Sequence, residues 1–308
     1  MIYFEIIAGI LLLLAGGELL VRGAVQTARH LGVSPLLIGL TFVSFGTSAP
    51  ELVTSVEAAL LESPGIAVGN VVGSNIANVL LILGLTALLQ PVETPENGFR
   101  RDGIMLLLAT FACLTIILME QLSRAAGGIM LGLLAGYILY CYRTERVAPG
   151  PEQSGRAQLA PFVAVVLALL GLTIIIAGAR FLVYGAIQLA ELAGVSETII
   201  GLTIVAVGTS LPELAASAVA ALRGEPGVAF GNIIGSSIYN ILGILGVTAL
   251  IHPIAVPSEI MHFDIWVMTA ATLAMIVFAL TNRCVSRSEG GGFLAAYIVY
   301  IGFLAYST

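Results

Sequence analysis

The stretch Gly46-Thr47-Ser48-Ala49-Pro50-Glu51 places two hydroxyls, a proline and a carboxylate inside hydrophobic sequence, and it recurs as Gly208-Thr209-Ser210-Leu211-Pro212-Glu213. Each copy is followed by a second motif, rich in glycine and asparagine, at Gly69–Asn78 or Gly231–Asn240. The copies lie 162 residues apart, and 31 of 54 positions are identical when 39–92 is aligned with 201–254. Identity at this level indicates an internal duplication.

Composition places the chain in a membrane. Of its 308 residues 58% are hydrophobic and 10% are charged, and the mean hydropathy is +1.05. Soluble proteins carry about 25% charged residues. The apolar runs are continuous rather than alternating, which favours helices over a β-barrel. We therefore expect an all-α polytopic membrane protein. Its first apolar run is interpreted as a spanning helix, because no basic segment or cleavage site of a signal peptide accompanies it.

Ten apolar runs are long enough to cross a hydrocarbon layer of about 30 Å. They lie near 2–24, 33–60, 65–90, 102–119, 124–142, 159–184, 195–222, 227–251, 263–281 and 291–307. A polar segment with two prolines, 143–158, separates the fifth run from the sixth. The predicted organisation is a first five-helix repeat over 1–142, a short cytoplasmic linker over 143–158 and a second repeat over 159–308.

The basic residues predict the orientation. All twelve are Arg. With the N-terminus outside, the inner loops hold ten of them and the outer side keeps only Arg124 and Arg180, in agreement with the positive-inside rule. Both termini are therefore expected on the outer face of a cell (inner) membrane.

An odd number of helices per repeat has a topological consequence. The sixth helix starts on the opposite side from the first, so the two repeats are predicted to be inverted relative to each other. Inverted repeats are a common architecture of secondary transporters.

Proline predicts a break in the second and seventh helices. Pro50 lacks an amide hydrogen and clashes with the carbonyl four residues before it, at Gly46, while Ala49 is pushed from helical angles. We expect helix two to unwind over 46–49 and restart at Pro50, and helix seven to break at the equivalent place. Unwinding frees carbonyl oxygens, which need partners in hydrocarbon, and a bound cation is one such partner.

The helix after each break carries a polar stripe. Asn70, Ser74 and Asn78 follow one another at intervals of four residues and share a helix face, and the second repeat has the same pattern. If these stripes meet the Glu51 and Glu213 segments, carboxylate, hydroxyl and amide oxygens converge. Such hard donors suit Ca²⁺ and Na⁺. One Ca²⁺, two Na⁺ or two protons would neutralise the two carboxylates.

Together these motifs resemble those of the cation/Ca²⁺ antiporter superfamily, most closely its prokaryotic Na⁺/Ca²⁺ exchanger branch, over essentially the whole chain. The resemblance implies antiport of Na⁺ and Ca²⁺ by alternating access, with the first and sixth helices sliding over a rigid core of eight. It implies no cofactor, and we expect no nucleic-acid partner and no obligate protein partner.

The resemblance also implies an ion-binding set. It comprises the shared carboxylates Glu51 and Glu213, backbone carbonyls of Thr47 and Thr209, the Na⁺-site serines Ser48, Ser210, Ser74 and Ser236, free carbonyls of Ser44 and Ala206, and the central Asn78 and Asn240. Some relatives carry Asp at the position of Asn240, including those that depend on K⁺. Asparagine there argues against K⁺ co-transport.

Other functions remain as alternatives. Ca²⁺/H⁺ antiport fits a pair of carboxylates that two protons can neutralise. A passive channel and an intramembrane enzyme using Ser48 or Ser210 are disfavoured, the first by the inverted repeats and the second because no His or Lys lies next to either serine in the sequence. The Ser and Asn stripes could also serve as helix–helix contacts. We interpret Glu57 as facing an entrance or solvent, and Glu18 as pairing with Arg22 or snorkelling.

Overall fold

The computed structural model describes residues 2–94, 99–119, 121–144, 159–194, 204, 206–256, 260–281 and 283–307. The described part of the first half comprises α1 (Ile2–Leu31), α2 (Pro35–Ile38), the π-helix η1 (Gly39–Val43), α3 (Ser44–Thr47), α4 (Ala49–Leu60), α5 (Pro64–Ile76), the π-helix η2 (Ala77–Leu83), α6 (Gly84–Leu89), β1 (Val92–Glu93), α7 (Phe99–Leu118), β2 (Gln121–Leu122) and α8 (Arg124–Thr144). That of the second half comprises α9 (Pro161–Leu192), α11 (Ala206–Thr209), α12 (Leu211–Leu222), α13 (Pro226–Ile238), the π-helices η4 (Tyr239–Ile244) and η5 (Ile260–Asp264), α14 (Leu245–Ile251), β3 (Ile254–Ala255), α15 (Ile265–Thr281), β4 (Cys284–Val285) and α16 (Arg287–Ser307).

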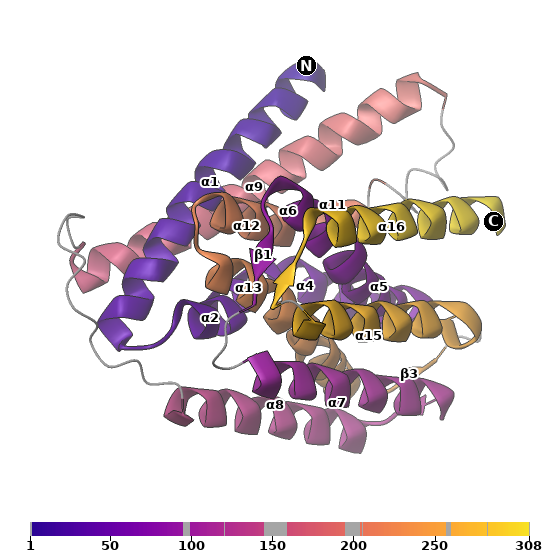
Figure 1. Cartoon of the computed structure of the whole chain (residues 1–308). Helices are drawn as coiled ribbons and strands as arrows, with labels where there is room; N and C mark the ends of the chain where they lie inside the picture. The colour runs from indigo at the N-terminus through magenta and orange to yellow at the C-terminus, as the bar shows by residue number, and fades with distance from the viewer. Residues whose placement is uncertain are drawn as a thin grey trace.

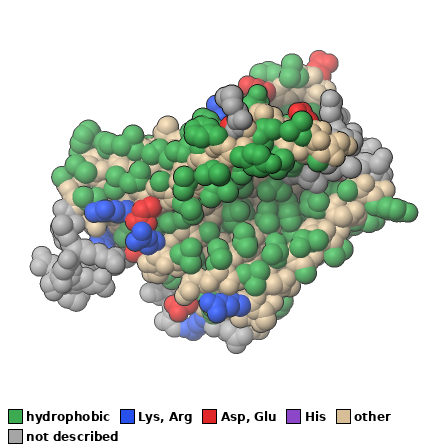
Figure 2. Space-filling model, turned by 90° about the horizontal axis from the view of Figure 1, so that it is seen from above, with side chains coloured by type: hydrophobic (Ala, Val, Ile, Leu, Met, Phe, Trp, Pro, Cys, Tyr) green, Lys and Arg blue, Asp and Glu red, His purple; other side chains and the backbone are tan. Residues whose placement is uncertain are grey.

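The described residues form an all-helical polytopic membrane fold. Eight helices in them are long and apolar enough to cross a membrane, and nine if the bent pair 35–47 and 49–60 is one span. The predicted run 195–222 is described only at residue 204 and from residue 206 onward, where α12 is a shorter apolar helix. The predicted linker lies largely outside the described residues, and α8 continues through its first two positions. Hydrophobic side chains cover most of the face seen in Figure 2, where charged side chains gather in a few patches.

The two longest helices, α1 and α9, lie side by side and project from the rest of the fold (Figure 1). They contain 30 and 32 residues, or about 45–48 Å of helix, so they must tilt in a hydrocarbon layer of about 30 Å. Both extend beyond the predicted runs 2–24 and 159–184. We call the end at which α1 begins and α9 ends the outer end, following the predicted orientation, and the opposite end the inner end.

Glycines allow α1 and α9 to pack with their backbones in contact. A Cβ atom on Gly9 would lie 2.6 Å from the backbone nitrogen of Leu182, and one on Gly171 would lie 2.3 Å from that of Leu20. Three glycines per helix repeat at intervals of seven residues: Gly9, Gly16 and Gly23 in α1, and Gly171, Gly178 and Gly185 in α9. Gly9 contacts Leu182, Gly16 contacts Ile175 and Gly23 contacts Ala168. The residue numbers therefore increase along α1 as they decrease along α9, so the two helices are antiparallel.

The helix interruption at Ser48 is shorter than the sequence predicts. The segments 35–47 and 49–60 meet at 45°, but α3 stays helical through Thr47 and α4 begins at Ala49, one residue before Pro50. Proline is tolerated in the first turn of a helix, so only Ser48 must leave the helical path. The expectation that 46–49 unwinds as a segment is therefore wrong. In the second half Ser210 occupies the equivalent place between α11 and α12.

Gly46 and Gly208 allow α9 to pack closely against the segments that carry the first motif. A Cβ atom on Gly46 would meet the side chain of Leu172 at 2.5 Å, and one on Gly208 would meet Val183 at 2.4 Å. Both contacts are with α9. The long helix therefore lies directly against the segments that precede Ser48 and Ser210.

Two small antiparallel strand pairs join the halves. Val92 of β1 pairs with Val285 of β4, and Leu122 of β2 pairs with Ile254 of β3. The strands β1 and β3 are themselves 162 residues apart. Each pair thus links the segment after α6 or α14 to a loop of the other half.

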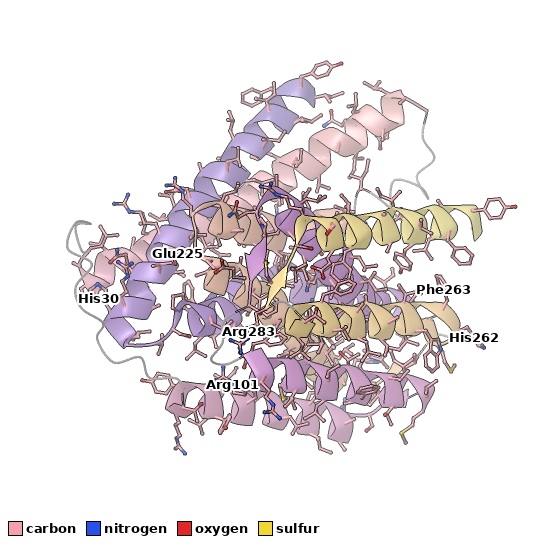
Figure 3. The ribbon with its side chains drawn as sticks, in the orientation of Figure 1. His30, Arg101, Glu225, His262, Phe263 and Arg283 are labelled. Atoms are coloured by element: carbon pink, nitrogen blue, oxygen red, sulfur yellow. The ribbon has the colours of Figure 1, made fainter. Side chains whose placement is uncertain are left out.

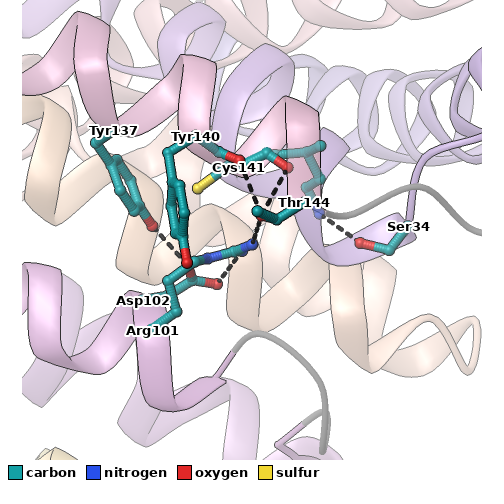
Figure 4. A network of polar contacts seen from close by, with 8 residues as sticks. Ser34, Arg101, Asp102, Tyr137, Tyr140, Cys141 and Thr144 are labelled. Carbon is teal, nitrogen blue, oxygen red and sulfur yellow. Dashed lines mark hydrogen bonds and ion pairs between the residues drawn. The ribbon is translucent and has the colours of Figure 1, made fainter.

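A buried acid in the first half is fully paired. Arg101 binds the two oxygens of Asp102 at 2.5 and 3.0 Å, and the Tyr137 hydroxyl donates to Asp102 at 2.7 Å (Figure 4). A weaker contact of 3.5 Å joins Arg101 to Thr144. The network fastens α7 to α8, and a buried charge of this kind is stable because it is paired and hydrogen-bonded.

Candidate ion-binding site

Glu51 and Glu213 lie three residues after the interruptions at Ser48 and Ser210, in the first turns of α4 and α12. Both are buried, with 0% and 1% of their surface exposed. Among the described residues, neither oxygen of the Glu51 carboxylate has a hydrogen-bond partner, and Glu213 has one on a single oxygen. The acid Asp102 is paired, as described above, and Glu5 accepts a hydrogen bond from Gln188 at 2.9 Å. The unpaired oxygens therefore distinguish the two glutamates from the other buried acids.

Hydrogen bonds from Thr47 and Ser48 cross between the two halves at this place. The Ser48 hydroxyl donates to Oε1 of Glu213 at 2.7 Å, and the Thr47 hydroxyl donates to Oδ1 of Asn232 at 3.3 Å. Because Ser48 lies three residues before Glu51, its bond to Glu213 brings the two acid-bearing segments together. The structure thus brings the two copies of the first motif together, as the duplicated sequence predicts.

Two asparagines hold the helices that carry the acids. Asn70 donates to the Glu51 carbonyl at 3.0 Å and to the Ser55 hydroxyl at 2.9 Å. Asn232 makes the same pair of bonds, to the Glu213 carbonyl at 3.3 Å and to the Ser217 hydroxyl at 2.9 Å. The supporting serines were not singled out from the sequence. Their signal was present, because Ser55 and Ser217 are identical residues at the repeat offset and lie one turn after the glutamates.

The central asparagines lie in π-helical turns. Asn78 belongs to η2 and Asn240 to η4, and such turns are rare and often found at functional sites. Asn78 donates to the Ser237 hydroxyl at 3.3 Å, and that hydroxyl in turn donates to the Ile233 carbonyl. Ser237 occupies the position that Asn75 has in the first repeat, and among the described residues only Ser237 of this pair makes a hydrogen bond across the halves, since Asn75 donates to the Val71 carbonyl within its own helix.

Unpartnered polar atoms gather on the residues that the resemblance named. Within the described part of the chain they include both Glu51 oxygens, Oε2 of Glu213, Oδ1 of Asn78, both amide atoms of Asn240, and the hydroxyls of Ser210 and Ser236. An unsatisfied buried polar group costs about 1–3 kcal/mol. A set of such groups, most of them oxygens, is suited to a cation that accepts their lone pairs.

The family model for the sodium/calcium exchanger protein matches residues 2–143 and 163–306. The chain belongs to the sodium/calcium exchanger family. Among its relatives, a putative antiporter, CaxA of Alkalimonas amylolytica, is 40% identical over 305 residues, which cover 96% of each chain. The sodium/calcium exchanger MaX1 of Methanosarcina acetivorans is 33% identical, and the aligned region covers 99% of this chain and 98% of MaX1.

A solved structure of the sodium-calcium exchanger NCX_Mj, soaked with Na⁺ and Ca²⁺, has the same fold. The TM-score is 0.84 at 33% identity, with 98% of this chain and 97% of that chain covered. The resemblance inferred from the motifs, and the all-helical membrane fold it implied, are thus confirmed. These relatives are named as an antiporter or as exchangers.

Of the predicted ligands of this exchanger-family chain, Ser44 needs correction, and Ala206 borders residues that the structure does not describe. The Ser44 carbonyl is not free, because it accepts the Ser48 amide at 3.0 Å and the Thr47 hydroxyl at 3.3 Å. The helix stays intact through Thr47, so this carbonyl keeps its helical partner. Ala206 begins α11, where the preceding residue is not described. Ser74 is buried in α5 as expected, and Thr209 lines a cavity at the outer end.

Proposed function

We propose that this chain is a secondary antiporter that exchanges Na⁺ for Ca²⁺ across a prokaryotic cell membrane by alternating access. The observation that carries the proposal is the pair of buried glutamates, one from each half, whose carboxylate oxygens are largely unpartnered among the residues that the structure describes. The expected ligands are Glu51 and Glu213 together with neutral oxygens of their neighbouring Thr, Ser and Asn residues. Transported ions are then substrates that satisfy these groups in turn.

Charge balance explains why such a site exchanges ions. A carboxylate inside a bilayer costs about 2.5–3.5 kcal/mol on insertion scales, and two close together repel each other. One Ca²⁺ or two Na⁺ restores neutrality, so the two ions compete for the same oxygens. An occupied, neutral site can move between the two sides at lower cost than an empty one.

We infer that the chain has ten spans arranged as two inverted five-helix repeats over 1–142 and 159–308. The antiparallel packing of α1 on α9, the strand pairs related by the repeat offset, and the two segments matched by the family model support this arrangement. The breaks at Ser48 and Ser210 lie at equivalent places in the two halves. Both termini are placed outside by the distribution of arginine.

Transport in proteoliposomes tests the proposal. We expect Ca²⁺ uptake that requires an outward Na⁺ gradient and that falls to background in Glu51→Gln and Glu213→Gln, because each change removes a charge that the ions neutralise. Glu191→Gln is the matched control, since Glu191 is an exposed acid near the end of α9. Uptake that ignores the Na⁺ gradient, or that survives both site variants, would contradict the proposal.

Ca²⁺/H⁺ antiport is the second candidate. With Asn at both central positions the named ion-binding set holds two carboxylates, and two protons would neutralise them as well as two Na⁺. Imposing a pH gradient without Na⁺, and then a Na⁺ gradient at equal pH, separates the candidates. Uptake driven by the pH gradient alone would favour the second candidate.

A further inference from the structure

At the inner end, an ion pair ties α1 to the core. Glu18 of α1 binds Arg223, which caps the C-terminal end of α12, at 2.5 Å. Among the described residues Glu18 pairs with Arg223 and not with Arg22, which the sequence suggested as its partner unless it snorkelled. Both side chains are partly exposed, 34% for Glu18 and 59% for Arg223, and they border a pocket of about 330 Å³ that Arg29 and Glu225 also line. Figure 3 labels Glu225, together with His30 at the end of α1.

At the outer end, the equivalent region is open. A cavity of about 950 Å³ lies between α4 and α9. It is lined by Pro50 and Pro212, next to the two buried acids, and by Arg180 of α9 and Glu57 near the end of α4. Within the described residues neither Arg180 nor Glu57 takes part in an ion pair.

The repeat relates the two ends. Glu18 and Arg180 occupy the same position in the two halves, 162 residues apart, and Arg223 corresponds to Leu61. Glu57 lies four residues before Leu61 and therefore on the same face, one turn away. The outer end thus has the two charges needed for a second ion pair, with the acid and the base exchanged between the long helix and the core.

The backbone contacts between α1 and α9 make these helices move together. A Cβ atom on Gly16 would lie 2.7 Å from the backbone nitrogen of Ile175, and one on Gly178 would lie 2.8 Å from that of Leu13. Such packing resists sliding of one helix along the other. Since the helices are antiparallel, a shift that withdraws Glu18 from the end of α12 also moves Arg180 relative to the end of α4.

We propose that these four residues form two alternating ion pairs that position α1 and α9 during transport. Glu18–Arg223 holds the state in which the outer cavity is open, and Arg180–Glu57 forms in the opposite state. They are positioning residues, because none is among the proposed ion ligands. This proposal rests on the alternating access of the proposed function and assigns it a pair of charge contacts.

Cysteine accessibility in proteoliposomes without transported ions tests the proposal. The outer reporter is Val53→Cys, which lies in the open cavity and is 55% exposed. The inner reporter is Val219→Cys, which packs close to Gly17 of α1 and is 8% exposed. Both reporters are made in a chain that carries Cys284→Ser, because Cys284 is partly exposed and would react with the maleimide. Cys113 and Cys141 are fully buried and can stay. An impermeant maleimide is applied from the side of each reporter.

Partly exposed ion pairs shift equilibria modestly, by about 1.5- to 5-fold. Glu18→Gln and Arg223→Gln are expected to accelerate labelling of the inner reporter and slow that of the outer one, so that the ratio of the two rates changes by such a factor. Arg180→Gln and Glu57→Gln are expected to do the reverse. Exchanging the charges, with Glu18→Arg and Arg223→Glu together, should return both rates toward those of the parent, and Glu191→Gln should change neither.

The proposal fails if the ratio of the two labelling rates is unchanged in Glu18→Gln and Arg180→Gln, or if both shift it in the same direction. A variant that does not fold will label rapidly at both reporters and will no longer elute as a monodisperse peak. The charge-exchanged variant controls for such misfolding. Labelling does not depend on which ion is carried. If the labelling rates shift as stated but the protein shows no Na⁺-driven Ca²⁺ uptake, the Na⁺/Ca²⁺ exchange proposal is rejected and the ion-pair proposal stands.

Discussion

At the scale of single residues, hydrogen bonding distinguishes the buried acids that we propose as ion ligands from the other buried acids. Asp102 has Arg101 and Tyr137 as partners, whereas both oxygens of the Glu51 carboxylate lack one among the described residues. The same test separates two serines that the repeat makes equivalent. Ser48 donates to Glu213, while the Ser210 hydroxyl has no partner in the described part of the chain. Sequence identity therefore conceals a structural asymmetry.

This asymmetry predicts different effects for two matched substitutions. Without transported ions, Ser48→Ala should lower the free energy of unfolding by about 1–3 kcal/mol, because the buried Glu213 carboxylate loses a hydrogen bond. Ser210→Ala should have little effect under the same conditions, since it breaks no such bond. Thermal unfolding in detergent measures both. Equal destabilisation by the two variants would contradict the asymmetry.

Cys284, in β4 between α15 and α16, offers a prediction outside the spanning segments. Partial burial raises the pKa of its thiol, and the nearby carboxylates Glu93 and Glu289 raise it further. Since the thiolate is the reactive form, maleimide labelling of Cys284 should be slow at pH 7 and rise as the pH increases toward the raised pKa. Glu93→Gln should accelerate labelling at pH 7, because it removes one negative charge. An unchanged rate would show that burial alone controls the thiol.

At the scale of elements, glycine determines how the long helices pack. The seven-residue spacing of glycine in α1 and α9 lets backbone lie against backbone, and Gly46 and Gly208 let α9 rest on the segments before both interruptions. The interruptions at Ser48 and Ser210 are thereby coupled by direct contact to the helix proposed to move. The contact is steric and therefore sensitive to a single added methyl group.

Gly171→Ala should destabilise the fold. Its Cβ would lie 2.3 Å from the backbone nitrogen of Leu20, which can yield only if the two helices separate. We expect a loss of about 1–3 kcal/mol, as for other overpacked interiors. Gly132→Ala in α8 is the control, because a Cβ there meets nothing within 4 Å and alanine favours a helix by up to about 1 kcal/mol. The two substitutions should shift the unfolding temperature in opposite directions.

At the scale of the whole molecule, the proposed orientation fixes which cavity faces which side. The larger cavity lies at the end where α1 begins, and the smaller pocket with Glu18 and Arg223 lies at the end where α1 stops. Both termini are predicted to lie on the same side of the membrane as the larger cavity. The positive-inside rule then assigns that cavity to the outside of the cell.

Labelling of intact cells tests this orientation. Made with Cys284→Ser, Tyr306→Cys near the end of α16 should react with an impermeant maleimide added outside, since this position is 92% exposed. Arg143→Cys near the end of α8 should react only after the cells are permeabilised. The reverse pattern would invert the topology and exchange the outer and inner ends throughout.

The sequence by itself determined the membrane class, the duplication and the family, and it supplied most of the residues that we propose as ion ligands. These follow from composition and from motifs, which need no knowledge of distance. The extent of the break at Ser48, the supporting bonds of Asn70 and Asn232, and the partner of Glu18 were decided only by the tertiary structure. Each depends on contacts between helices distant in the chain, and periodicity along one helix cannot specify which residue of another helix it meets.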